Sequence, residues 1–101
     1  MAARGAFEAC LHTVKEGDLR GAEQRYLDDN ARDWRLSGLM GTASLIQVLR
    51  GMVDRDAYEY QHAEVTGDTA RIGVRDGGTE FTVILYKDRR GWRIHDLYLG
   101  G

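Results

Sequence analysis

Proline is missing from this sequence, and cysteine occurs only once, at Cys10. Without proline, the turns depend mainly on glycine, aspartate and asparagine. A single cysteine excludes an internal disulfide, and its place on an apolar helical stripe indicates a small core residue rather than a nucleophile. We therefore expect a reducing, cytoplasmic compartment.

Long hydrophobic runs and a strong net charge are missing as well. No apolar run approaches the roughly 20 residues that span a bilayer, and the first five residues lack the apolar core of an export signal, so we expect neither a membrane nor export. The 14 basic and 16 acidic residues leave a formal net charge of −2. This balance gives no long-range attraction to nucleic acid, which is therefore not an expected partner.

The 101 residues are 43% hydrophobic and 30% charged, an ordinary globular composition that suits one domain over 1–101 with one core. Apolar residues recur at helical spacing over 3–16, over 19–28, and again after a cap at Thr42 or Ser44. Three helices are therefore expected in the first half of the chain.

Residues 31–41 have a less regular pattern, because Gly38 and Gly41 interrupt any helix there. We expect a loop or a short helical turn that folds over the core. Trp34 lies in this segment, where it either forms the wall of a pocket, with Asp33 as an acid and Arg35 as an anion anchor, or fills the open end of the domain.

From Ala57 the apolar period changes to two, which is typical of strands. Four strands are expected at about 57–66, 69–76, 79–88 and 91–99. The three turns between them are Gly67-Asp68, Gly77-Gly78 and Arg89-Arg90. The resulting fold class is α+β, with three N-terminal helices on a curved four-stranded antiparallel meander.

Two-residue turns fix the register of these strands, because flanking residues pair and share a face. The face that the helices should cover then holds Ala63, Val65, Ile72, Val74, Phe81, Val83, Leu85, Trp92, Ile94, Asp96 and Tyr98. The opposite face holds Tyr60, His62, Glu64, Arg71, Arg75, Glu80, Thr82, Ile84, Tyr86, Arg93, His95 and Leu97. The first set is mostly apolar, and the second mixes apolar and charged side chains.

The order of these elements resembles the NTF2-like superfamily, which includes SnoaL-like and ketosteroid-isomerase-like proteins. Two short motifs carry the resemblance: the Glu16-Gly17-Asp18 junction after the first helix, and the closing Gly91-Trp92-Arg93-Ile94 segment. The resemblance implies a pocket between the concave sheet face and the helices, and dimerisation through the sheet. Because members include both enzymes and non-catalytic binding or assembly domains, it does not imply one function.

Asp96 is the main candidate for chemistry, because the predicted register places its carboxylate among core-facing neighbours. Burial would raise its pKa, as a general acid or base requires, and Tyr98 could assist proton transfer next to a carbonyl. The alternative is structural: Asp96 binds a helix N-terminus, the Trp34 indole or an arginine.

A ligand pocket is predicted beneath the helices, and its candidate lining residues are Trp34, Gln61, Phe81, Val83 and Trp92. A homodimer is predicted through the opposite face, with Tyr60, His62, Ile84, Tyr86, His95 and Leu97 as candidate contacts. Tyrosines and arginines on that face also fit RNA stacking, but the acidic partners of those arginines argue against it.

Neither a metal nor another cofactor is expected, since His12, His62 and His95 do not have the spacing of a ligand set. The function predicted from the sequence is a small non-catalytic binding or assembly domain with an apolar ligand. The alternative is an isomerase, cyclase or hydratase acting on a hydrophobic carbonyl or polyketide-like substrate through Asp96.

Overall fold

The computed structural model describes residues 2–39 and 41–100, and the predicted α+β fold class is confirmed. Within these ranges, no helix is both long and apolar enough to cross a membrane. The elements in chain order are α1 (Ala2–Lys15), α2 (Leu19–Tyr26), α3 (Asp29–Asp33), β1 (Arg35–Gly38), β2 (Gly41–Ser44), α4 (Leu45–Arg55), β3 (Tyr58–Thr66), β4 (Thr69–Asp76), β5 (Thr79–Asp88) and β6 (Gly91–Leu99).

Local signals set the boundary between α1 and α2. Gly17 adopts a φ of +90°, which favours glycine and ends α1. The next residue, Asp18, caps α2 by accepting a hydrogen bond from the Gly21 backbone N–H at 3.0 Å. The short junction therefore turns the chain and starts the second helix, as the sequence predicts.

The segment after α2 is more regular than predicted. Asp28 caps the short helix α3 by accepting from the Ala31 N–H at 3.0 Å, and β1 and β2 then pair as a hairpin in which Gly38 lies opposite Gly41. The expected short helical turn is present over 31–33, within α3. The alternative of a loop is wrong for the residues that follow, because the two glycines flank a hairpin; Met40, between them, lies outside the described residues.

Helix α4 begins with a capping box. The Ser44 hydroxyl accepts from the Gln47 N–H at 3.3 Å, and the Gln47 side chain accepts from the Ser44 N–H at 2.8 Å. Ser44 is therefore the cap, whereas Thr42, the other candidate, lies in β2.

Strands β3 to β6 form one antiparallel sheet in sequence order, but two β-bulges change the predicted register. Pairing around Gly77-Gly78 follows the prediction throughout. On β3, Gln61 is an extra residue between the pairs that Tyr60 and His62 make. On β6, His95 is an extra residue between the pairs that Ile94 and Asp96 make. The side chains from Asp96 onward therefore point to the face opposite the predicted one.

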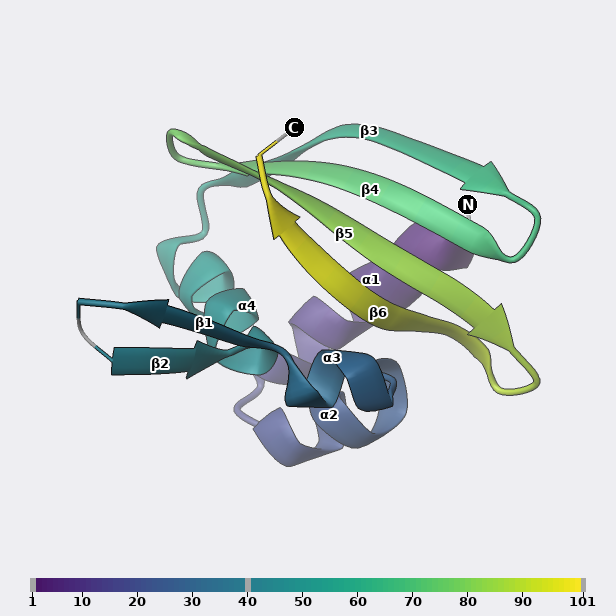
Figure 1. The fold of residues 1–101 in the computed structure, drawn as a ribbon, viewed down its shortest axis with the longest axis horizontal. Helices are drawn as coiled ribbons and strands as arrows, with labels where there is room; N and C mark the ends of the chain where they lie inside the picture. The colour runs from purple at the N-terminus through teal and green to yellow at the C-terminus, as the bar shows by residue number, and fades with distance from the viewer. Residues whose placement is uncertain (1, 40, 101) are drawn as a thin grey trace.

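The helices lie on one side of the curved sheet and leave the other side uncovered (Figure 1). We call these the inner and outer faces. The inner face meets the α1 stripe in one apolar core, whose fully buried large side chains include Phe7, Leu27, Leu45, Leu49, Met52, Ile72, Leu85 and Ile94. The far end of β3 extends beyond this cover: Ala63 is exposed, and Val65, predicted to lie under the helices, is 44% exposed.

An ion pair joins the end of α4 to the end of β4. The Asp76 side chain is 2% exposed, and it accepts hydrogen bonds from the Arg55 guanidinium, with the Nε donor 3.0 Å from Oδ2. This partner raises the pKa of Arg55. Because Asp76 is buried, its charge depends on this single arginine side chain.

We expect Asp76→Asn to lower the free energy of unfolding by about 1–3 kcal/mol, because it breaks a buried charge-assisted pair. Asp54→Asn is the matched control, since Asp54 makes only an exposed contact with Arg50 at 3.9 Å and should change stability by less than about 0.5 kcal/mol. Urea unfolding measures both, and equal losses would contradict a special role for the buried pair.

Candidate functional site

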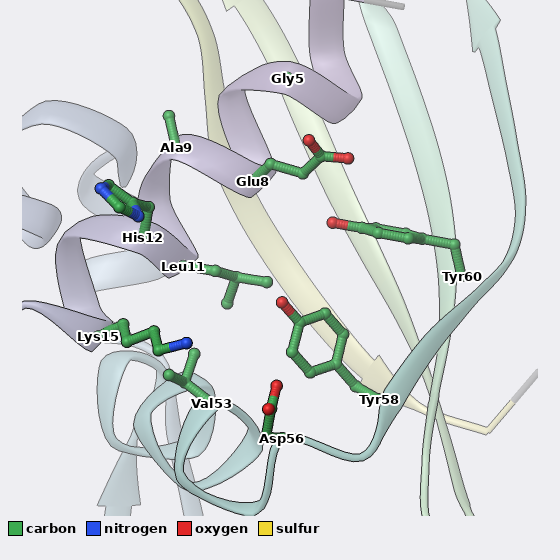
Figure 2. A pocket seen from close by; sticks show the side chains of 10 residues that line it. All are labelled: Gly5, Glu8, Ala9, Leu11, His12, Lys15, Val53, Asp56, Tyr58 and Tyr60. Atoms are coloured by element: carbon green, nitrogen blue, oxygen red, sulfur yellow. The ribbon is translucent and has the colours of Figure 1, made fainter.

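A cleft of about 550 Å³ opens between α1, the first half of β3 and the end of α4 (Figure 2). Its floor is apolar and its rim carries charged and polar groups. The lining residues are Gly5, Glu8, Ala9, Leu11, His12, Lys15, Val53, Asp56, Tyr58 and Tyr60. This volume lies within the range of about 300–1,000 Å³ that is usual for small-molecule sites.

Helix α1 supplies a polar stripe to the rim. Glu8, His12 and Lys15 recur at helical spacing and flank Leu11, which is buried in the core. Glu8 forms an ion pair with Arg4 at 3.0 Å. Both side chains are about half exposed, so the pair is open to competition from solvent or another charge.

Strand β3 supplies two aromatic rings to the cleft. The bulge at Gln61 turns Tyr60 to the inner face, where its ring meets Phe7 edge to face at 6.2 Å. Tyr58, two residues earlier, contacts the Tyr60 ring in the same geometry, also at 6.2 Å. The Arg4 guanidinium lies 3.9 Å from the centre of the Tyr60 ring.

Burial and charge both act on the tyrosine hydroxyls. Burial first, and then the charge of Glu8, raises the pKa of Tyr60 to about 12, although the nearby Arg4 guanidinium acts in the opposite direction. Burial also raises the pKa of Tyr58, and the carboxylates of Asp56 and Glu8 add to this effect. Both hydroxyls therefore remain protonated at neutral pH.

The Tyr60 hydroxyl is buried and makes no hydrogen bond of good geometry among the described residues, although the Arg4 guanidinium over its ring is close enough to lower the pKa of the hydroxyl. A buried polar group in this state costs about 1–3 kcal/mol relative to a satisfied one. The rest of the Tyr60 side chain is only partly buried and borders the cleft. The hydroxyl therefore has unused hydrogen-bonding capacity, but it is covered, so a group in the cleft reaches it only when a neighbouring side chain such as Arg4 moves aside.

Asp56 completes the rim because of an unusual backbone conformation. Its φ of +48° places it in the left-handed region at the end of α4, where its N–H donates to the Met52 and Val53 carbonyls. The backbone thus ends the helix, and the exposed carboxylate lies beside the Tyr58 ring (Figure 2).

Comparison with solved structures identifies the architecture. The chain is similar to a structure named as a variant of Rd1NTF2_05, with a TM-score of 0.64 and 19% identity over 97% of this chain and 96% of that one. An NTF2-like protein of unknown function from Silicibacter pomeroyi DSS-3 gives a TM-score of 0.62 and 17% identity over 98% and 93%. The chain has an NTF2-like fold.

A de novo designed protein with a curved β-sheet also matches this NTF2-like chain, with a TM-score of 0.56 and 14% identity over 100% of both chains. No protein-family model and no curated protein matches the sequence. The likeness therefore establishes the NTF2-like fold, and function has to be argued from the cleft.

Asp96 and Tyr98 lie on the outer face of the NTF2-like sheet, so the prediction that they face the core was wrong. The bulge at His95 pairs Asp96 with Ile84, and Leu97 enters the core in its place. Asp96 accepts a hydrogen bond from the Leu97 N–H at 2.8 Å. Its charge raises the pKa of Tyr98, whose side chain is 52% exposed.

The five predicted ligand residues do not line the cleft. Phe81 and Val83 are buried in the core, and Gln61 is the exposed bulge residue. The Trp34 indole donates to the Leu97 carbonyl at 3.0 Å, and Trp92 packs against the core. Side chains thus fill the centre of the domain, and the open volume lies at its side.

The six predicted dimer contacts divide between the two faces. His62, Ile84 and Tyr86 lie on the outer face, but the bulges move Tyr60 and Leu97 to the inner one. His95 stacks on Tyr86 with ring centres 4.0 Å apart, and its Nδ1 lies 2.7 Å from the Asp28 carboxylate. The outer face therefore loses two of its predicted members, and Ile84, which remains on it, is only 6% exposed.

The sequence analysis missed Glu8 and Asp56 as site residues. The sequence signal for Glu8 was its position beside the apolar stripe of α1. For Asp56, the one signal was its position directly after the last residue of α4.

Within the described residues, no group of three His, Cys, Asp or Glu side chains gathers as a metal site. Burial raises the pKa of the Cys10 thiol to about 12, which leaves it unreactive at neutral pH.

We expect Tyr60→Phe to remove a phenolate transition centred near pH 12, visible as a difference in absorbance between the two proteins. Because the folded pKa is raised above the unfolded value near 10, the contribution of Tyr60 to stability is complete below about pH 10 and is lost as the pH rises through 12. In urea the same difference should move to about pH 10. A transition near pH 10 in the folded protein would contradict the burial of this hydroxyl.

Proposed function

We propose that this chain is a small-molecule binding domain whose ligand occupies the cleft between α1 and β3. The observation that carries the proposal is the buried Tyr60 hydroxyl without a partner beside an open volume. A ligand oxygen or nitrogen that displaces the Arg4 guanidinium from Tyr60 would satisfy this hydroxyl and recover part of its desolvation cost.

Binding without chemistry fits the cleft better than catalysis. Its two carboxylates, Glu8 and Asp56, are both exposed, whereas an acid or base that works near neutral pH is usually tuned by burial. The cleft combines an apolar floor with a few converging polar groups, which is the usual composition of a binding pocket. The free, buried Cys10 thiol also supports a reducing cytoplasm as the proposed compartment.

Filling the cleft should abolish ligand binding. Val53 lies at the base of the cleft (Figure 2), and we expect Val53→Phe to weaken the binding of indole and 2-phenylethanol at least tenfold by occupying their space. The readout is the displacement of the Tyr58 and Tyr60 resonances in an NMR titration. Val65→Phe makes the same change at an exposed site on β3 outside the cleft and should leave binding unchanged; equal affinities in all three proteins would contradict the proposed site.

We also propose that the outer sheet face forms a homodimer interface. Tyr86 and Tyr98 are 43% and 52% exposed on this face. Charges of both signs lie on the same face, including the Arg75–Glu80 pair at 2.6 Å. A face with such a mixture can meet its own copy with opposite charges aligned.

Tyr98→Glu should weaken dimerisation at least tenfold, because it removes an exposed aromatic side chain and adds a charge at the proposed contact. Gln24→Glu adds the same charge on α2, away from the sheet, and should leave association unchanged. Sedimentation equilibrium over a range of concentrations measures both. A wild-type chain that remains monomeric at high concentration would refute the dimer.

A further inference from the structure

We propose that the cleft between α1 and β3 selects a ligand with a protonated amine attached to an apolar body. This inference rests on the proposed binding function and adds the chemical class of the ligand. Four features support it. They are the two carboxylates of the rim, the tyrosine rings between them, the Arg4 guanidinium that already lies over one of these rings, and the position of Lys15, the single lysine of the lining.

The two carboxylates line the cleft from two different elements. Glu8 comes from α1 and Asp56 from the end of α4, and both lie on the lining of the same volume (Figure 2). After burial, the charges of both also raise the pKa of Tyr58, which lies between them. A cation placed there is attracted by two carboxylates at once.

The Tyr58 and Tyr60 rings suit the same kind of group. An aromatic face attracts a cation, and a tyrosine hydroxyl oxygen can accept a hydrogen bond from an ammonium N–H. The Tyr60 hydroxyl, which has hydrogen-bonding capacity to spare, adds a place for this hydrogen bond once the ligand displaces Arg4. Val53 and Leu11, both buried at the base of the cleft, provide the apolar surface for the rest of the ligand.

Arg4 shows that this environment binds a cation. Its guanidinium lies 3.9 Å from the centre of the Tyr60 ring, and its Nε donates to the Glu8 carboxylate at 3.0 Å. A cation is thus held between an aromatic face and a carboxylate at the edge of the cleft. Arg4 is exposed, so an ammonium ligand could compete with it for Glu8 at a low cost.

Lys15 is the one lysine on the rim, and it does not cancel this preference. Figure 2 shows its ammonium near Val53, at the opposite end of the cleft from Tyr60. His12 is the remaining titratable group of the lining. Its Nε2 lies 3.2 Å from a carboxylate oxygen of Glu16, which is not a lining residue. The Lys15 ammonium is therefore remote from the end of the cleft where Glu8 and Tyr60 lie, and Arg4 is the cation that a ligand would have to replace there.

Three probes of similar size test the inference: phenethylamine, 2-phenylethanol and 3-phenylpropanoate, which are cationic, neutral and anionic at pH 7. NMR titration should show the amine binding roughly tenfold more tightly than the alcohol, with the carboxylate weakest. The preference for the amine should shrink in high salt, because the rim is exposed to solvent.

Matched substitutions locate the preference. Glu8→Gln and Asp56→Asn should each reduce the amine preference several-fold and leave 2-phenylethanol binding unchanged, and asparagine tolerates the left-handed backbone at residue 56. Glu59→Gln is the control, since it removes the same charge from an exposed residue of β3 outside the cleft.

Arg4→Gln gives a change in the opposite direction, which loss of folding cannot imitate. Removing the internal cation frees Glu8 and the Tyr60 ring, so amine affinity should rise several-fold. Arg20→Gln removes the same charge from an exposed position on α2 and should have no such effect.

Each outcome separates this inference from the proposed function. If the amine and the alcohol bind the cleft equally, amine selection is wrong and the binding site remains. If none of the three probes displaces the Tyr58 or Tyr60 resonances, both are wrong. Selective gain of amine binding in Arg4→Gln, together with its loss in Glu8→Gln, would establish the cation preference.

Discussion

Two extra residues in the sheet decide which side chains this protein presents on each face. Side chains alternate along a strand with a period of two, so one inserted residue reverses the direction of every side chain beyond it. The bulge at Gln61 brings Tyr60 to the inner face, and the bulge at His95 sends Asp96 outward. The cleft and the filled centre of the domain both depend on these two reversals.

The sequence predicted the features that depend on a few neighbouring residues. The apolar stripe of α1, the caps at Asp18 and Ser44, and the pairing around Gly77-Gly78 all follow from local patterns. The bulges could not be predicted in this way, because neither Gln61 nor His95 differs from an ordinary strand residue. Their positions depend on how the sheet curves over the helices, which is a property of the whole fold.

The candidate site was misplaced for the same reason. With a regular register, Asp96 was the only carboxylate expected under the helices, and Tyr60 was expected on the opposite face. The actual cleft combines a helix rim, the backbone of Asp56 and a shifted strand residue. Trp34, which could have formed a pocket wall, instead bonds to the Leu97 carbonyl and helps close the core.

The bulge at Gln61 has a consequence for solubility as well as for the cleft. Strand β3 is one edge of the sheet, and its residues from 61 to 66 are exposed. The opposite edge, β6, is partly protected, because the Asp28 N–H donates a hydrogen bond to its Ile94 carbonyl. An exposed edge can pair with the edge of another molecule and start aggregation. Gln61 interrupts the row of free N–H and C=O groups along this edge, and the charge of Glu64 further opposes the pairing of a second strand. The bulge residue that shapes the cleft therefore also protects the chain from edge-to-edge association.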